Sequence, residues 1–287
     1  MTPSFQNAAR VGGLFATAIM LFLLAACSTT GGSSAKRPET TADNRRHTVL
    51  PGTTDSPAQE PDLWQRMRAG FAMQMPDDPQ IDVELRWYLD HPLFLDNALT
   101  RGNRYLFHIL GEVEARGLPS ELALLPVVES AFQPSAVSRS NAVGLWQFLS
   151  ETGRDYGLQQ TAWQDQRRDV VESTRAALDY FVALGRQFDG DWALAVAAYN
   201  GGPGYVSRMC ESNRMASRGI GFMDLPLRPE TRCYVPKLLA LRKIVEDPGR
   251  YGVTLPEIRN TPYFTSLDVD GPLRLDLLAA VQNLSPD

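Results

Sequence analysis

The feature that most constrains the fold is a stripe of apolar residues with helical spacing in the second half of the chain. Its members recur at intervals of three, four and seven residues: Val170, Val171, Thr174, Ala177, Leu178, Phe181 and Phe188. No long alternation of apolar and polar residues, which is typical of a half-buried strand, appears in the middle of the chain. The sequence therefore predicts a mainly α fold.

Shorter helical patterns precede this stripe and predict a helical extension over residues 62–110. The first begins at Asp62, a residue that favours helix N-caps, and its apolar positions run from Leu63 to Phe71. A second short pattern lies around Trp87, and a third runs as one helix from Leu95 towards Gly117. We expect the apolar members of these patterns to form core.

Charge and histidine placement exclude two classes of function. The chain has 28 basic and 33 acidic residues and a formal net charge of −5, without a basic block that would attract nucleic acid. Its three histidines, His47, His91 and His108, have no cysteine or histidine neighbour at metal-ligand spacing. We predict no nucleic-acid partner, no metal ion and no cofactor.

The N-terminus has the form of a bacterial lipoprotein signal. Arg10 precedes an apolar stretch over residues 11–24, too short for a comfortable membrane span, and small residues lead directly to Cys27. This predicts a signal peptide over 1–26, with Cys27 as the lipidated new N-terminus anchored in the membrane. Because Ser28 is not acidic, the resemblance to sorted bacterial lipoproteins favours the periplasmic face of the outer membrane. The alternative is an uncleaved anchor helix with an incidental cysteine.

The segment after this cysteine is predicted to be a flexible linker, so residues 27–61 comprise the lipidated cysteine and a tether. From Ser28 to Pro61 the chain is rich in Ser, Thr, Gly and Pro, and Val49 and Leu50 are its only large apolar residues. Such a segment cannot bury enough surface to offset the entropy of folding.

Export to an oxidising compartment makes a disulfide between the two remaining cysteines, Cys210 and Cys233, one prediction. On the chain-entropy model it would stabilise the fold by roughly 3 kcal/mol. The alternative is two reduced, buried thiols.

A carboxylate stands in an apolar run in the segment LPVVESAF, residues 125–132. Pro119 and Ser120 open the predicted helix, Pro126 should kink it, and Glu129 lies near its C-terminal end. Apolar neighbours and the negative end of the helix dipole both disfavour the anion. We therefore expect the pKa of Glu129 to rise towards about 6 to 7, which suits a general acid. The alternative is a solvent-facing glutamate on the polar side of the helix.

Four segments in this order resemble the lytic transglycosylases of bacterial cell walls. They are Glu129-Ser130, Gly144-Leu145-Trp146-Gln147, Ala198-Tyr199-Asn200 and the run ETRCYVPKLLA over 230–240. The family commonly has Met where this chain has Trp146. The first and last segments look most like the membrane-bound D-type members. The resemblance implies a lysozyme-like, SLT-type catalytic domain, which we place at residues 111–260.

The resemblance also implies an activity on peptidoglycan glycan strands. The expected reaction cleaves the β-1,4 bond between N-acetylmuramic acid and N-acetylglucosamine and leaves a 1,6-anhydromuramoyl end, with Glu129 as general acid and then base. By motif position, the substrate-binding residues are Ser130, Ser138, Trp146, Gln147, Tyr199, Asn200 and Tyr234. Trp146 would form an apolar wall beside the acid. For Ser130 a purely local hydrogen bond is an equal alternative.

Three rival functions stay open at this stage. A hydrolytic lysozyme-like muramidase would need a second acid, for which Asp155 and Asp165 are available in the sequence. A noncatalytic peptidoglycan-binding lipoprotein would not need Glu129, and a helical scaffold would leave the polar motif residues unexplained. Residues 261–287 form a C-terminal tail in which no LysM glycan-binding repeat is recognised.

Overall fold

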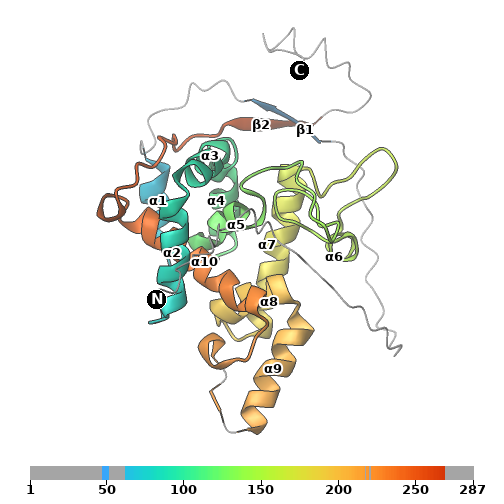
Figure 1. The fold of residues 1–287 in the computed structure, drawn as a ribbon. Helices are drawn as coiled ribbons and strands as arrows, with labels where there is room; N and C mark the ends of the chain where they lie inside the picture. The colour runs from blue at the N-terminus through green and yellow to red at the C-terminus, as the bar shows by residue number, and fades with distance from the viewer. Residues whose placement is uncertain (1–46, 52–61, 217, 220, 269–287) are drawn as a thin grey trace, which may run out of the picture.

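The computed structural model describes residues 47–51 and 62–268, apart from 217 and 220 (Figure 1). Cys27, the predicted signal peptide and most of the predicted linker and tail therefore lie outside the described residues. Within the described part of the chain, no helix combines the length and the apolar character needed to cross a membrane.

The described residues are mainly helical, which confirms the predicted fold class. The α-helices are α1 (Leu63–Ala69), α2 (Pro79–Asp90), α3 (Pro92–Gly102), α4 (Leu106–Ala115), α5 (Leu125–Ser130), α6 (Ser150–Asp155), α7 (Val170–Gln187), α8 (Trp192–Gly201), α9 (Pro203–Met215) and α10 (Pro229–Glu246). Short 3-10 helices are η1 (Ser120–Leu124), η2 (Phe222–Asp224) and η3 (Gly249–Tyr251). Asp62 caps α1 by accepting a hydrogen bond from the Trp64 amide at 2.9 Å, as expected.

Two expected helices differ in detail from the structure. The apolar pattern from Leu95 to Val113 is divided between α3 and α4, because the chain turns at residues 103–105. The helix expected to kink at Pro126 is instead a 3-10 turn followed by α5, and Pro126 lies in the first turn of α5. A proline in a first turn costs no intrahelical hydrogen bond, so it starts this helix rather than bending it.

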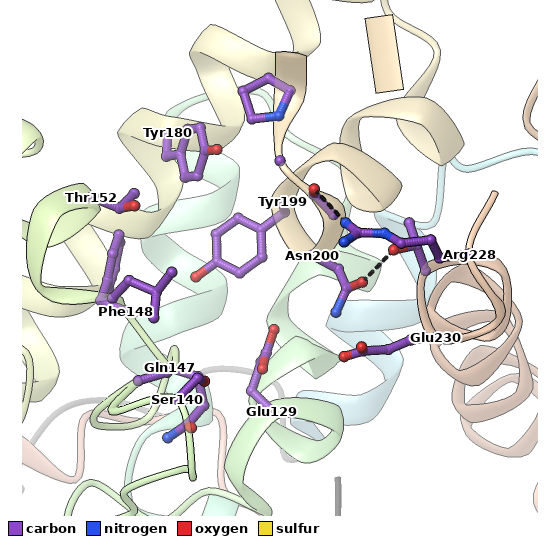
Figure 2. Close-up of a pocket in the computed structure, with 16 residues that line it drawn as sticks. Glu129, Ser140, Gln147, Phe148, Thr152, Tyr180, Tyr199, Asn200, Arg228 and Glu230 are labelled. Carbon is purple, nitrogen blue, oxygen red and sulfur yellow. Dashed lines mark hydrogen bonds between the residues drawn. The ribbon is translucent and has the colours of Figure 1, made fainter. Parts of the chain in front are cut away.

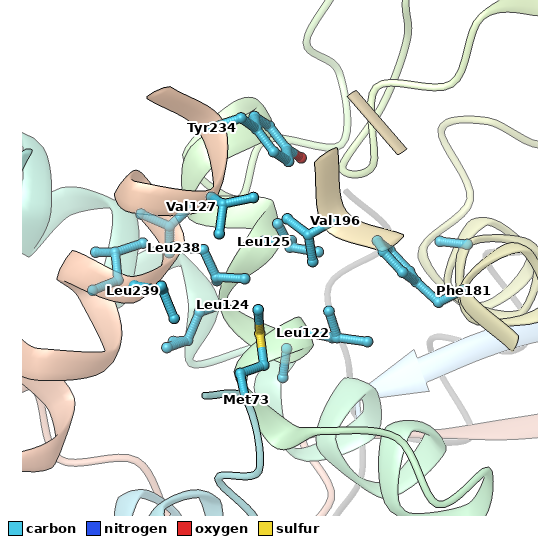
Figure 3. Close-up of a cluster of buried hydrophobic side chains, with 14 of the residues drawn as sticks. Met73, Leu122, Leu124, Leu125, Val127, Phe181, Val196, Tyr234, Leu238 and Leu239 are labelled. Atoms are coloured by element: carbon cyan, nitrogen blue, oxygen red, sulfur yellow. The ribbon is translucent and has the colours of Figure 1, made fainter. Parts of the chain in front are cut away.

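Helix α5 and the 3-10 turn before it lie at the centre of the molecule, between α4, α7, α8 and α10 (Figure 1). Figure 3 shows Leu124, Leu125 and Val127 packed towards Val196 of α8 and Leu238 of α10. All five side chains are fully buried. Because the segment carrying Glu129 is held on several sides by apolar contacts, its backbone is fixed by the core.

Part of the predicted tether is ordered. Strand β1 (His47–Pro51) pairs antiparallel with β2 (Phe264–Asp268), and Val49 lies opposite Ser266 in this pair. The tether prediction did not foresee this strand, since the hydrogen-bonding partner comes from a segment more than 200 residues away in the sequence.

The structure does not contain the predicted disulfide. Cys210 on α9 is buried and belongs to the hydrophobic core, whereas Cys233 on α10 is half-buried. The Cys233 thiol interacts with Glu84 of α2, and its pKa is raised chiefly by burial. Cys210 and Cys233 are therefore not bonded to each other in the structure.

Candidate active site

Glu129 is presented at the very end of α5. The helix stops because Ala131 and Phe132 both adopt left-handed backbone conformations, with φ of 50° and 57°. Their amides close the helix end on the carbonyls of Val127 and Pro126, at 3.2 and 3.0 Å. The chain thus turns away immediately after Glu129, whose side chain points into a pocket (Figure 2).

This pocket has a volume of about 250 Å³ and is formed by segments from the middle and the end of the chain. Its lining residues are Glu129, Ser140, Ala142, Gln147, Phe148, Leu149, Thr152, Tyr180, Tyr199, Asn200, Gly201, Gly202, Pro203, Arg228, Glu230 and Thr231. Of the predicted binding residues, Gln147, Tyr199 and Asn200 therefore line it together with Glu129.

The surroundings of Glu129 raise its pKa to about 7. Burial of the carboxyl group is the largest cause, and the nearby charge of Glu230 adds to it. The hydroxyl of Tyr234, on α10, donates a hydrogen bond to the Glu129 Oε1 atom and opposes the rise, as does the charge of Lys237. At neutral pH the group can therefore both give and take a proton, as the apolar sequence context predicted.

Tyr199 is held rigidly beside this acid. Its ring stacks on Phe181 with 4.6 Å between centroids, and its hydroxyl donates to the carbonyl of Trp146 at 2.8 Å. Burial holds the pKa of Tyr199 and of Tyr234 well above the ordinary value, so both hydroxyls stay neutral. Each is a fixed neutral donor next to the group that changes its protonation state.

The loop between α5 and α6 supplies the polar wall of the pocket. Gly144 has a φ of 87°, and a Cβ atom there would lie 1.8 Å from the carbonyl oxygen of Arg167, so only glycine fits. Gln147 also has a positive φ, of 50°, and its side-chain amide donates to the Gly144 carbonyl at 2.9 Å. This tight turn fixes the direction of the Gln147 side chain.

Four residues predicted to bind substrate, namely Ser138, Ser130, Tyr234 and Trp146, do not line the pocket. Ser138 accepts a hydrogen bond from the Ala142 amide at 3.0 Å and contacts Ser140, which does line it. Ser130 is buried, and its hydroxyl lies 2.9 Å from the carbonyl of Leu145 and 3.3 Å from that of Pro126, the second contact being the local hydrogen bond weighed as the alternative. Tyr234 is buried behind Glu129 and touches it directly.

Trp146 does not form the expected apolar wall beside the acid. Its side chain has no exposed surface, and its indole Nε1 donates to the Thr174 hydroxyl at 3.0 Å. The residue reaches the site through its backbone carbonyl, which accepts from Tyr199. The larger side chain is accommodated by the core under α7, and Phe148 lines the pocket instead.

Sequence reasoning missed a cluster at the start of α10. Glu230 lines the pocket, and burial raises its pKa, against which an interaction with the Asn200 amide acts. The Thr231 hydroxyl donates to Asn200 Oδ1 at 3.0 Å and so orients that amide. Glu230 stands four residues before Tyr234 on one helix, and this spacing was the available signal that both face the same side.

The other carboxylates considered from the sequence lie away from the pocket. Asp165 forms an ion pair with Arg167 at 2.8 Å, which lowers the Asp165 pKa, and neither it nor Asp155 lines the pocket. Among the described residues, no group of three or more His, Cys, Asp or Glu side chains is arranged to hold a metal ion.

Comparison with known proteins relates the chain to one family. Residues 111–218 match the family described as Transglycosylase SLT domain. Membrane-bound lytic murein transglycosylase D of Escherichia coli (strain K12) is 41% identical over 234 residues, covering 82% of this chain and 51% of that protein. The chain thus spans about half the length of this relative.

Two further similarities cover smaller shares of the chain. A putative tributyltin chloride resistance protein of Alteromonas sp. (strain M-1) is 38% identical over 189 residues, which are 66% of this chain and 88% of that protein. The solved lytic transglycosylase Slt of Pseudomonas aeruginosa is 27% identical with a TM-score of 0.40, over 55% of this chain and 26% of that chain. The chain belongs to the family of lytic transglycosylases that carry an SLT domain.

Proposed function

We propose that this protein is a peptidoglycan lytic transglycosylase. It cleaves the β-1,4 bond between N-acetylmuramic acid and N-acetylglucosamine and leaves a 1,6-anhydromuramoyl end. The observation that carries the proposal is the Glu129 carboxyl group, which lies in the pocket with a pKa of about 7 beside two neutral tyrosine hydroxyls. The family match and the names of the transglycosylase relatives support the same activity.

Glu129 serves the reaction twice. As an acid it gives its proton to the oxygen of the leaving sugar while the bond from that oxygen to C1 breaks. The substrate's own 2-acetamido group stabilises C1. The Glu129 carboxylate then takes the proton of the C6 hydroxyl, whose oxygen closes on C1, and the acid is restored. An intramolecular nucleophile has a high effective molarity, so no positioned water is required.

The neighbouring residues have separate tasks in this scheme. The Tyr234 hydroxyl stabilises the carboxylate form of Glu129 between the two steps, because it donates to Oε1. Gln147, Tyr199 and Asn200 face the glycan from the pocket wall. Ser138, Ser130 and Trp146 support the pocket from behind through the contacts described above.

The test is mass spectrometry of the fragments that the purified full chain releases from peptidoglycan, beside the Glu129→Gln variant. We expect muropeptides that end in anhydromuramic acid, and none from the variant. Thermal unfolding of both proteins verifies that the variant is folded. Binding of peptidoglycan without any release by the wild-type chain would overturn the proposal in favour of a wall-binding protein.

A hydrolytic muramidase is the second candidate, and Glu230 is the observation that favours it. This residue puts a second carboxylate into the pocket, as a mechanism with an activated water requires. The same mass spectra separate the two reactions, since hydrolysis gives reducing ends that are heavier by one water.

We further propose that the protein is a periplasmic outer-membrane lipoprotein attached through Cys27, with its domains divided as predicted from the sequence. The word "membrane-bound" in the names of relatives supports a membrane-associated location in the cell envelope. The test is fractionation of cells that express the chain or its Cys27→Ser variant. Equal recovery of both in the outer-membrane fraction would contradict lipid anchoring at this residue.

A further inference from the structure

Glu230 is a carboxylate that the proposed reaction does not use. Figure 2 shows the Glu230 carboxyl group directed towards the side chain of Glu129, with both groups beneath Asn200. They come from α5 and α10, and both line the pocket. Two carboxyl groups that share a small, partly desolvated pocket repel each other when both are charged, so one of them is favoured in its protonated form.

Glu230 is the better placed of the two acids to carry the charge. Its partner Asn200 is oriented by the Thr231 hydroxyl, and Glu230 is the more exposed of the two acids. Burial raises the pKa of Glu230, but interactions with Arg228, Lys237 and Asn200 each favour its charged form. The same surroundings leave Glu129 with the Tyr234 hydroxyl and the more weakly acting Lys237 as stabilisers of its anion.

Arg228 does not cancel the charge of Glu230 by a direct ion pair. Its guanidinium donates to the Gly201 carbonyl at 3.0 Å and lies 4.3 Å from the centre of the Tyr205 ring. Among the described residues, neither Glu230 nor Glu129 has a cationic nitrogen within 4.0 Å. The negative charge of Glu230 therefore remains effective inside the pocket.

We propose that Glu230 is a positioning residue that keeps Glu129 protonated, and thus ready to donate, until substrate is bound. Glu230 acts through Glu129 and takes no proton from the substrate. This inference rests on the proposed role of Glu129 as acid, but it concerns an equilibrium of the free protein. It can therefore be measured without any turnover.

The experiment follows the titration of the Glu129 carboxyl carbon by NMR in the ¹³C-glutamate-labelled full chain, with Glu129→Gln used to assign the signal. In Glu230→Gln we expect the Glu129 midpoint to fall by about half a pH unit or more. Glu230→Asp, which keeps the charge, should restore most of the shift. The matched control is Glu246→Gln, the same substitution on the exposed far end of α10, which should leave the midpoint unchanged.

Cleavage assays separate this inference from the proposed function. The basic limb of the kcat/KM profile should move to lower pH in Glu230→Gln by the same amount as the midpoint. An unchanged midpoint in a folded Glu230→Gln variant overturns the proposal, as does complete loss of cleavage without a shift, which would make Glu230 a direct participant. Reducing-end products from the wild type would refute the transglycosylase function. The NMR titration would still decide whether Glu230 raises the Glu129 midpoint.

Discussion

Two glutamates eight residues apart lie at opposite ends of the segment 120–130 and have opposite surroundings. Glu121 is fully buried, accepts hydrogen bonds from the amides of Ala72 and Met73 at 3.0 to 3.1 Å, and pairs with Arg242 at 3.0 Å. Glu129 opens onto a pocket and has one hydroxyl donor.

Burial raises the pKa of both carboxyl groups, so a shifted pKa alone does not distinguish them. The difference lies in how many of the acceptor positions of each carboxylate are occupied by the protein. Glu121 has its oxygens filled by fixed donors, which makes it a structural group. Among the described residues only the Tyr234 hydroxyl donates to Glu129, so one of its oxygens is open to the pocket, which suits the chemical role proposed for it.

Of the substitutions that distinguish Glu129 from Glu121, we expect Glu129→Gln to have the largest effect. Cleavage of peptidoglycan should fall about a thousandfold or more, because the proton donor and acceptor is lost. Below about pH 4.5, where Glu129 is protonated in both states, the free energy of unfolding should change by less than about 1 kcal/mol, since no buried cation loses a partner. The rate at which fragments are released from peptidoglycan measures cleavage, and urea unfolding measures the stability. Residual cleavage within tenfold of the wild type would deny Glu129 its role.

The reverse pattern is expected from Glu121→Gln. Removing this charge leaves the Arg242 guanidinium buried without its anion and should lower the free energy of unfolding by about 3 kcal/mol. Urea unfolding followed by circular dichroism measures the change. The matched control is Glu246→Gln, because Glu246 is the exposed partner of the same arginine at 3.9 Å. Equal stability of the two variants would contradict a structural role for Glu121.

The titration of Glu129 should also make the free energy of unfolding depend on pH. Its pKa is about 7 in the folded chain and 4.5 in the absence of surroundings, so between these values the unfolded chain loses the proton first. The wild type should therefore lose stability relative to Glu129→Gln as pH rises from about 4.5 to 7, by about 3 kcal/mol. Below this window both states are protonated and the difference disappears. Parallel pH profiles of the two proteins would show that Glu129 titrates normally.

A smaller effect is expected from Tyr234→Phe. Without the hydroxyl the carboxylate form of Glu129 loses its donor, so the Glu129 pKa should rise further and the basic limb of the kcat profile should move to higher pH. Cleavage should fall about tenfold, the value of one hydrogen bond to a charged group. Tyr251→Phe, outside the pocket, is the matched control. A shift to lower pH would reverse the assigned direction of the hydrogen bond.

The sequence predicted the helices and the position of Glu129 better than it predicted the pocket around it. The periodicity of a helix and its N-cap depend on residues close together in the sequence. The cap at Asp62 and the apolar stripe of α7 could therefore be predicted. The pocket instead joins α5, α8 and α10, and contacts such as Tyr234 with Glu129 span 105 residues. Such contacts are set by the packing of helices that lie far apart in the sequence. Trp146 shows the same limit, because a motif position does not reveal whether a side chain or only its carbonyl reaches the site.

The buried Glu121 also bears on which part of the chain can fold as an autonomous unit. The residues that match the SLT family begin at 111 and end at 218. A fragment with those limits would lack the amides of residues 72 and 73 and the guanidinium of Arg242, and so would contain a desolvated anion without its partners. It would also lack Tyr234. The cooperative folding unit is therefore larger than the recognisable family segment, and it extends from the first helix to α10.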